Sequence, residues 1–285
     1  MKKVILIPNQ KKDEALKVTA DVIKKLVSLN ITPYIDCAFE GLKKVGAVTY
    51  SDLPNDAELV IVLGGDGSVI DASRIAIALD IPMLGINLGK VGYLSEVEID
   101  NINLLDRLVT GDYSLESKML LTVERYSPEG VHEISVRDAV NDVVFSHEDY
   151  LGISDFKLEN SNGDRLVYRA DGLILSTPAG STAYSLSAGG PIVAHGLDSI
   201  TVTPVCPHSF FNRSIVYGKD ECIKISNSGD AALNVSVDGR LFAKITAGEW
   251  CVVKKSSKRL KMLTFSENNM FSVLFKKIKV LNGTV

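Results

Sequence analysis

The sequence predicts two domains: an N-terminal α/β domain with a mostly parallel sheet, and a second, mainly antiparallel β domain. The protein is therefore expected to be α+β overall. Strand-like and helix-like segments alternate over the first ~100 residues. After them, short strand-like runs follow one another, separated by turn signals. A length of 285 residues is enough for two hydrophobic cores. We place the domains at residues 1–100 and 101–265, followed by a tail, 266–285.

Composition limits the classes of function open to the chain. A hydrophobic content of 46% with 23% charged residues is typical of a globular protein. The net charge of −4 gives no general reason to expect nucleic acid or a membrane surface as a partner. No apolar run approaches the ~20 residues that span a bilayer. The four cysteines are widely spaced, with no C-x-x-C pair, which favours reduced thiols in a cytoplasmic protein over disulfides or a metal site.

The chain begins with a strand, a helix and a second strand. Val4–Ile7 is apolar but stops at a proline followed by acidic residues, so it predicts a strand rather than a signal peptide. Apolar residues at helical spacing predict a helix over Asp13–Leu29, and Thr32–Ile35 is the next strand. Phe39–Asn55 carries two glycines and a proline and is predicted to be a linker.

The strongest local signal follows that linker. Leu59–Leu63 is a continuous apolar run, which predicts a strand buried on both faces. Glycines end the strand, and a helical pattern then begins. Glycine lets the backbone turn sharply and approach a ligand, and the helix N-terminus offers N–H groups to an anion. The residues expected to bind phosphate are Gly64, Gly65, Gly67 and Ser68. Asp66 lies among them, at the carboxyl edge of the sheet, where ligands bind in α/β folds.

Two better-known phosphate motifs are absent from this region. The dinucleotide fingerprint requires a third glycine where the chain has Ile70. Gly85–Val91 lacks the spacing and the Ser or Thr of a Walker A loop. Pro82–Asn87 is a further buried strand, and Gly89–Tyr93 is expected to form a second loop beside the first. A lone Asp-Gly would favour a plain turn after the strand, but the whole pattern favours a ligand-binding loop over that alternative.

The second half of the chain has the texture of a β domain. A short helix is predicted over Asn101–Val109. The strand-like runs that follow are Leu120–Glu124, His132–Val136, Val140–Phe145, Phe156–Glu159, Leu166–Ser176, Ile200–Val205, Cys222–Ser226, Ala232–Val237 and Trp250–Lys254. Apolar and basic residues alternate over Phe271–Val280, as in an amphipathic end packed against the body.

Two stretches of this domain carry polar residues suited to a nucleoside. Asn141 and Asp142 lie inside an otherwise apolar run, so one of them points inward and needs a partner such as a ribose hydroxyl or an adenine amine. A turn at the strand end is an equal alternative. Arg169 and Asp171, two apart, share one face if they lie on a strand. The hydroxyl- and glycine-rich segment after them, up to Pro191, offers many small polar groups to a ligand.

Together these stretches resemble the NAD kinase family, which shares a Gly-Gly-Asp-Gly loop with diacylglycerol kinases and phosphofructokinases. Gly64–Gly67 matches that loop, Asn141-Asp142 matches the family's Asn followed by Glu or Asp, and Asp171–Pro191 matches its long signature. The resemblance covers most of the chain. It implies an α/β and a β-rich domain with the active site between them, a tail that returns to the first domain, and a homo-oligomer, dimer or tetramer.

The resemblance also implies roles for single residues. Asp66 resembles the catalytic acid that accepts the proton of the adenosine ribose 2′-hydroxyl of NAD. The positions that resemble substrate contacts are Gly67, Asn141, Asp142, Arg169, Asp171, Thr182, Ala183, Tyr184, Ser187 and Cys206. Cys206, Ser214 and Arg240 depart from the residues that are frequent in the family. His208 is expected to be structural, and Asp238-Gly239 to form a hairpin turn.

The implied reaction transfers a phosphoryl group from ATP or polyphosphate to NAD and makes NADP. Phosphoryl transfer needs positioning and charge neutralisation, so an ordinary carboxylate suffices. Mg²⁺ is expected to be held largely by the donor's phosphates, with no dedicated protein cage. Two alternatives remain: a lipid or sugar kinase with the same loop, which leaves Asn141-Asp142 without a role, and a non-catalytic NAD(P)-binding sensor, which has less need of Asp66.

Overall fold

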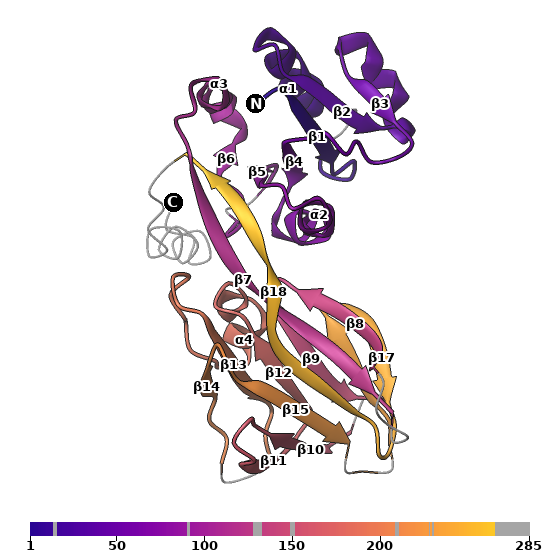
Figure 1. Cartoon of the computed structure of the whole chain (residues 1–285), viewed down its shortest axis with the longest axis vertical. Helices are drawn as coiled ribbons and strands as arrows, with labels where there is room; N and C mark the ends of the chain where they lie inside the picture. The colour runs from indigo at the N-terminus through magenta and orange to yellow at the C-terminus, as the bar shows by residue number, and fades with distance from the viewer. Residues whose placement is uncertain are drawn as a thin grey trace. The chain divides into compact units, whose positions relative to one another are not determined.

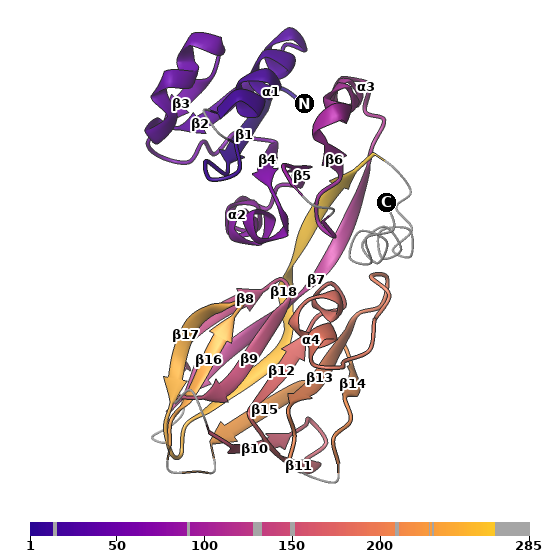
Figure 2. The ribbon, with the colours of Figure 1, turned by 180° about the vertical axis from the view of Figure 1, so that it is seen from behind.

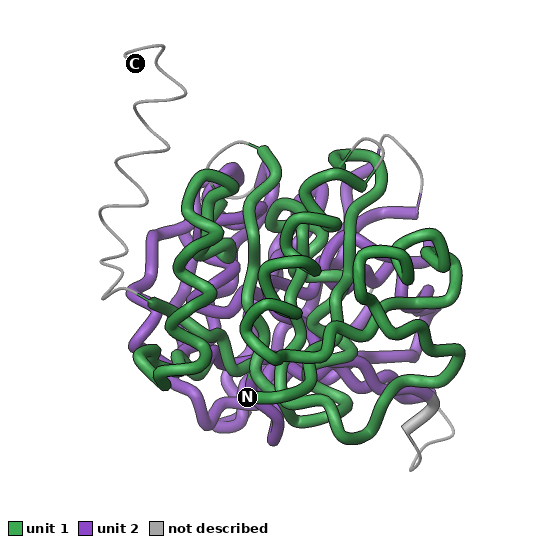
Figure 3. The backbone as a smooth tube through the Cα atoms, turned by 90° about the horizontal axis from the view of Figure 1, so that it is seen from above, with its two compact units in different colours: residues 1–117, 260–285 green, residues 118–259 purple. Residues whose placement is uncertain are grey.

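The computed structural model of the chain is drawn in Figure 1, and Figure 2 shows it from behind. It describes residues 1–13, 16–89, 92–127, 133–148, 152–208, 211–227, 229 and 231–265. The backbone divides into two compact units (Figure 3). Unit 1 is Met1–Ser117 with the segment that starts at Leu260, and unit 2 is Lys118–Arg259. The predicted tail, 266–285, lies outside the described residues.

Residues 101–117, which the sequence analysis assigned to the second domain, fall in unit 1. The reason is packing: Leu105 and Leu108 are buried in the core of that unit. They belong to a 3₁₀ helix, η3 (Ile99–Asp106), and a short helix, α3 (Arg107–Thr110), where one helix was expected.

Unit 1 is built on parallel strands in the order β5-β4-β1-β2-β3. Their bounds are β1 (Lys3–Pro8), β2 (Thr32–Asp36), β3 (Val48–Tyr50), β4 (Leu59–Gly64) and β5 (Met83–Asn87). Two further segments pair in parallel with β5. They are the short strand β6 (Val97–Glu98) and Met262 of β18 (Trp250–Thr264). Every residue of β4 is buried, as predicted for a strand covered on both faces. This order sets the carboxyl ends of β5, β4 and β1 next to one another.

Two longer helices pack on this sheet, α1 (Lys17–Ser28) and α2 (Asp66–Leu79). Val22, Ile23 and Leu26 of α1 are fully buried in the core of unit 1. The buried Asp13 carboxylate caps α1 by accepting hydrogen bonds from the N–H groups of Val18 (3.1 Å) and Thr19 (2.7 Å). The cap ties the end of the loop after β1 to the body of the unit.

The predicted linker Phe39–Asn55 is wrong. A 3₁₀ helix, η2 (Cys37–Val45), and strand β3 occupy most of that range. Asp36 caps η2 by accepting the N–H of Ala38 (2.8 Å), and Gly46 ends it with φ +104°. The glycine that indicated a loop is the C-terminal cap of a helix whose Leu42 is buried.

Unit 2 contains an antiparallel sheet with the strand order β14-β13-β12-β9-β16-β17. The bounds of these strands are β9 (Asp142–His147), β12 (Gly172–Ser176), β13 (Ser199–Val205), β14 (Ile215–Gly218), β16 (Leu233–Val237) and β17 (Arg240–Ile245). A second set comprises β7 (Ser114–Tyr126), β8 (Glu133–Ala139), β10 (Ser154–Glu159), β11 (Arg165–Ala170), β15 (Cys222–Asn227) and β18. Strands β7 and β18 each contribute residues to both units.

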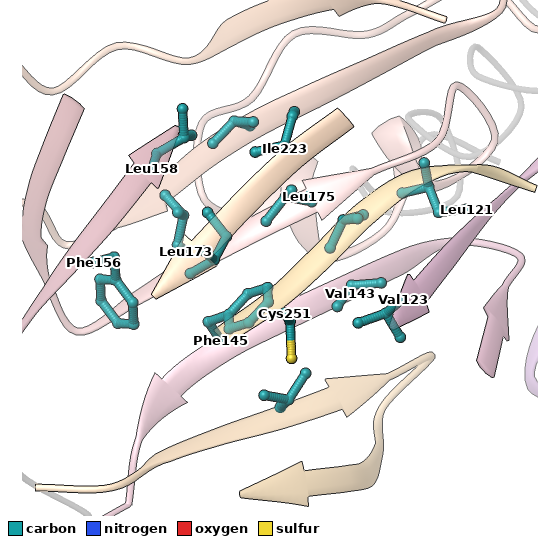
Figure 4. Packing of buried hydrophobic residues seen from close by; sticks show 14 of the residues in the cluster. Leu121, Val123, Val143, Phe145, Phe156, Leu158, Leu173, Leu175, Ile223 and Cys251 are labelled. Carbon is teal, nitrogen blue, oxygen red and sulfur yellow. The ribbon is translucent and has the colours of Figure 1, made fainter. Parts of the chain in front are cut away.

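The core of unit 2 lies between these strands (Figure 4). Its largest fully buried side chains are Tyr168, Phe145 and Phe156. Leu173 and Leu175 of β12 point into this core, so the alternate residues of β12, Ile174 and Ser176, point to the other face of the sheet.

The predicted single strand Leu166–Ser176 is two strands in different sheets, β11 and β12, and Asp171 lies between them. Arg169 and Asp171 therefore do not share one face of one strand. The sequence analysis missed β14 and β17, and β18 extends ten residues past the predicted Lys254, to Thr264. The fold class itself is confirmed, with a mostly parallel sheet in one unit and an antiparallel one in the other. No helix among the described residues is long and apolar enough to cross a membrane.

Candidate functional site

The glycine loop lies where β4 ends and α2 begins, at Gly64 to Ser68. Gly64 and Gly65 are buried, and Gly67 is exposed, with nothing within 4 Å of the position that a Cβ would take. A Cβ at Gly64 would collide with the Ser68 side chain. The loop leads into the N-terminus of α2, and the first N–H groups of a helix, which have no intrahelical partner, are a common anion site in proteins.

The Asp66 carboxylate is the acidic group of this loop, and it is held from a second loop. It is half-buried, and its two oxygens accept hydrogen bonds from the N–H groups of Tyr93 (2.9 Å) and Leu94 (3.0 Å). A Cβ at Gly92 would collide with this carboxylate. The predicted second loop therefore lies beside the first, although Lys90 and Val91 fall outside the described residues. Two amides therefore fix the orientation of a carboxylate in the glycine loop.

In unit 2, Asn141 and Asp142 sit at a strand end rather than inside a strand. Asn141 lies in the bend between β8 and β9, and Asp142 is the first residue of β9. The strand-end position matches the turn alternative, and Asp142 is buried there, with only 5% exposure. In the pairing of β9 with β12, Asp142 lies opposite Ser176.

Asp238 holds this strand end, a role that the sequence analysis missed. Its carboxylate accepts hydrogen bonds from three successive N–H groups, those of Val140 (2.9 Å), Asn141 (2.7 Å) and Asp142 (3.2 Å). Asp238 and Gly239 do form the predicted turn between β16 and β17, with φ values of 48° and 75°. Nothing in the sequence links this turn to Asn141, because their contact depends on the pairing of β16 with β9.

Burial, together with the negative charge of Asp238, raises the pKa of Asp142 to about 7. An ordinary aspartate is ionised well below neutrality. Asp142 therefore changes its charge near physiological pH, in the strand end that Asp238 fixes.

The hydroxyl-rich segment packs directly on Asn141. Thr177 donates its N–H to the carbonyl of Asn141 (2.9 Å) and its hydroxyl to the carbonyl of Val140 (2.7 Å). A Cβ on Gly180 would collide with the Asn141 backbone, so only glycine fits there. The 3₁₀ helix η4 (Gly180–Thr182) follows, and Ala183 comes next. The predicted contacts Asn141, Asp142, Thr182 and Ala183 thus belong to one locality.

The next predicted residues lie on α4 (Tyr184–Ser187), which contacts β13 of the antiparallel sheet through Thr203. The buried Ser185 hydroxyl bonds to that of Thr203 (3.1 Å), which bonds to that of Ser214 (3.0 Å). Tyr184 is 47% exposed, so its ring is accessible for stacking on a ligand.

A second group gathers at the opposite end of β12. Asp171 donates its N–H to the carbonyl of Val205 (3.0 Å), and His208 donates its N–H to the carbonyl of Arg169 (2.7 Å). The His208 ring nitrogen Nε2 lies 4.0 Å from the Asp171 carboxylate. Cys206, next to Val205, is exposed and has φ 45°. Asp171 precedes β12, whereas Asn141 is bonded to Thr177, which follows it, so the extended strand separates these residues from the Asn141 group by roughly 20 Å.

One charged group near the glycine loop was not anticipated. The Nζ of Lys12 lies 2.6 Å from the position that a Cβ on Gly65 would take, and 3.5 Å from the corresponding position on Gly89. The sequence shows only that Lys12 follows the first strand. The order of β5, β4 and β1 in the sheet brings it here.

Comparisons with known proteins agree with the predicted family. The family model of the ATP-NAD kinase N-terminal domain matches residues 4–113, and that of the C-terminal domain matches residues 140–265. The NAD kinase of Natranaerobius thermophilus is 36% identical, over 98% of both chains. The NAD kinase of Lachnoclostridium phytofermentans is 35% identical, over 97% of this chain and 99% of its own.

Solved structures share the fold. A yeast NADH kinase complexed with NADH matches with a TM-score of 0.84 and 20% identity, covering 96% of this chain and 86% of its own. An NAD kinase from Archaeoglobus fulgidus in complex with ATP matches with a TM-score of 0.71 and 22% identity, covering 97% and 98%. The two family models and the relatives, taken together, show that this chain belongs to the NAD kinase family.

Proposed function

We propose that the protein transfers the terminal phosphoryl group of ATP to the 2′-hydroxyl of the adenosine ribose of NAD, giving NADP and ADP. The observation that carries this proposal is the Asp66 carboxylate, fixed by the amides of Tyr93 and Leu94 at the start of α2. Family membership supports NAD as the acceptor. The same chemistry accepts polyphosphate as a donor, and the experiment below compares the two.

The proposed reaction forms one phosphorus–oxygen bond and breaks another. The ribose 2′-oxygen attacks the terminal phosphorus of ATP, and its proton passes to an oxygen of the Asp66 carboxylate. The bond from that phosphorus to the bridging oxygen breaks, and ADP leaves with the bonding electrons. The N–H groups of the glycine loop stabilise charge on the phosphate oxygens. Asp66 acts as the general base, and the amides that hold it keep an oxygen directed for proton transfer.

Magnesium enters as part of the substrate, bound to the donor's phosphates. No three His, Cys, Asp or Glu side chains are grouped to hold a metal ion within the part of the chain that the structure describes. The half-buried Asp66 carboxylate is an oxygen donor beside the phosphate loop, which suits a hard cation that keeps most of its water and phosphate ligands.

Unit 2 is proposed to recognise the dinucleotide. NAD has two nucleosides joined by a pyrophosphate, and the predicted contacts form two groups at opposite ends of β12. We assign the adenosine ribose to Asn141 and Asp142, with Thr182, Ala183, Tyr184 and Ser187 beside it. We assign the more distant part of NAD to the second group, Arg169, Asp171 and Cys206. The family resemblance supports both assignments.

Two further properties are proposed, the oligomeric state and the compartment. The resemblance supports a homo-oligomer, dimer or tetramer, which light scattering on the purified protein measures directly. The four cysteines are free thiols, three of them exposed, which supports a reducing compartment such as the cytoplasm.

The reaction is tested by incubating the purified protein with NAD, magnesium and either ATP or polyphosphate. We expect NADP, with the new phosphate assigned to the adenosine 2′-position by mass spectrometry and phosphorus NMR. NAD that carries 2′-deoxyadenosine should give no product, because it lacks the hydroxyl that accepts the phosphoryl group and that the site is proposed to hydrogen-bond. A phosphate at the 3′-position or on the nicotinamide ribose overturns the assignment. Tight NAD binding without any product indicates a sensor instead.

A further inference from the structure

We infer that Lys12 is a donor-phosphate ligand: its ε-ammonium binds the phosphate oxygens of the phosphoryl donor on the glycine loop. This inference rests on the proposed function, because it assigns a residue to the phosphate half of that reaction. Lys12 lies outside the Gly-Gly-Asp-Gly loop in sequence, and it reaches the loop from the turn after β1.

The position of the ammonium is the first observation. Its Nζ lies 2.6 Å from the Cβ position of Gly65 and 3.5 Å from that of Gly89. These glycines follow β4 and β5, neighbouring parallel strands whose carboxyl ends lie together. Any side chain at Gly65 would displace the ammonium. A positive charge is therefore held over the backbone that is expected to carry a polyphosphate.

The turn that carries Lys12 is anchored at both ends. Asn9 donates from its side-chain Nδ2 to the Ser68 hydroxyl of the phosphate loop (2.8 Å), and its N–H bonds to the carbonyl of Leu63 (2.9 Å). Asp13, next to Lys12, is 2% exposed and caps α1. The N–H groups of Lys12 and Asp13 both donate to the Asn9 carbonyl (3.0 Å each). Lys12 thus lies on a turn that hydrogen bonds hold in place, and one of these bonds joins the turn to Ser68 of the glycine loop.

The charge of Lys12 is available for a ligand. No ion pair joins it to a carboxylate among the described residues. It is exposed, so the fold does not depend on its burial. By contrast, Lys3 and Lys25 of the same unit are paired with Asp56 and Asp106. An ammonium over a phosphate loop neutralises charge on the donor without taking part in proton transfer.

The test compares Lys12→Met with Lys12→Arg and with Lys11→Met, which removes the neighbouring exposed lysine. We expect Lys12→Met to raise the KM for ATP by ~10- to 100-fold, the scale of a lost charge-assisted hydrogen bond. The Kd of NAD in Lys12→Met, measured by calorimetry, should differ from the wild-type value by less than about twofold. Lys12→Arg should retain most of the affinity, and Lys11→Met should behave as the wild type.

A binding measurement separates this inference from the proposed function. Calorimetry with inorganic triphosphate should show weaker binding to Lys12→Met than to the wild type, whether or not NADP is made. If the wild type makes NADP and the KM for ATP is unchanged in Lys12→Met, the assignment of Lys12 is wrong and the proposed function stands. If triphosphate binding differs but no NADP forms, the proposed function is wrong and Lys12 remains a phosphate ligand. An equal loss of ATP and NAD affinity also overturns the assignment.

Discussion

Each unit contains a carboxylate that accepts hydrogen bonds from the backbone of a distant loop. In unit 1, Asp66 accepts the N–H groups of Tyr93 and Leu94, and in unit 2, Asp238 accepts those of residues 140–142. The interaction is the same in both units, but the group that it positions differs. In unit 1 the loop positions the carboxylate, whereas in unit 2 the carboxylate positions the loop.

The surroundings of each carboxylate indicate whether the carboxylate or the backbone that it binds has the functional role. Asp66 lies in a glycine loop at the start of a helix, where Gly67 has open space at its Cβ position and little side-chain bulk surrounds the carboxylate. Asp238 lies on a hairpin turn, and the residues that it orders are Asn141 and the buried Asp142. A change at Asp66 should therefore alter the chemistry, and a change at Asp238 should alter affinity and stability. The variants Asp66→Asn and Asp238→Ala test that division.

The largest effect is expected at Asp66. Asp66→Asn keeps the shape of the side chain but cannot accept a proton, so kcat should fall by ~10²-fold or more. The Kd of NAD should stay within about twofold, because the contacts assigned to NAD lie mostly in unit 2. Steady-state kinetics and calorimetry on the same preparation measure both. Asp100→Asn, an exposed acid of unit 1, is the matched control. Near-normal turnover of Asp66→Asn would remove Asp66 from the catalytic role.

The next effect is expected at Asp238. Asp238→Ala leaves three backbone N–H groups without their acceptor, which costs roughly 1–3 kcal/mol in the free energy of unfolding. Because the Asp238 carboxylate positions Asn141 and Asp142, its loss should raise the Kd of NAD by about tenfold. The kcat at saturating NAD should fall far less than in Asp66→Asn.

Urea unfolding and calorimetry measure these changes, with Asp220→Ala, an exposed turn residue of unit 2, as the control. A loss of kcat as large as that of Asp66→Asn, at unchanged NAD affinity, would contradict the division of roles. It would place Asp238 in the chemistry.

The third effect depends on pH and concerns Asp142. Its pKa is raised to about 7 by burial and by the charge of Asp238, whereas an unfolded aspartate has a pKa of ~3.9. Between these values the native state binds a proton that the unfolded state lacks, so this group makes the protein less stable as the pH rises through 7. From pH 6 to pH 8.5 the loss should be about 1.4 kcal/mol.

Asp142→Asn removes this titration, so its unfolding free energy should fall less than that of the wild type over the same range. Urea unfolding at the two pH values provides the comparison. Parallel pH dependence in the wild type and the variant would show that the carboxyl of Asp142 does not titrate near neutrality.

The sequence was sufficient where a signal was local. The glycine loop between an apolar run and a helical pattern predicted both the buried strand β4 and the position of Asp66. The antiparallel character of unit 2 was also predicted, because turn signals separate its strands. Short-range order of this kind depends on neighbouring residues, which the sequence displays directly.

Prediction failed where tertiary packing decides the structure. Phe39–Asn55 has the composition of a linker, but Leu42 is buried and Gly46 caps a helix. Asp238 and Lys12 act on residues far from them in sequence, through strand pairings that no local pattern encodes. Arg169 and Asp171 were assigned to one strand because nothing in the sequence marks the change of sheet at Asp171.

The smallest effect is expected in the turn after β1. Asn9→Ala removes the hydrogen bond to the Ser68 hydroxyl (2.8 Å) and the acceptor of the Lys11 N–H (3.1 Å), both only partly buried or exposed. The free energy of unfolding should fall by ~1 kcal/mol. Because this turn carries Lys12, the KM for ATP should rise about two- to threefold while the Kd of NAD stays constant. Asn55→Ala, in an exposed loop of unit 1, is the control. A change in NAD affinity without a change in the KM for ATP would show that the turn does not serve the phosphate half of the reaction.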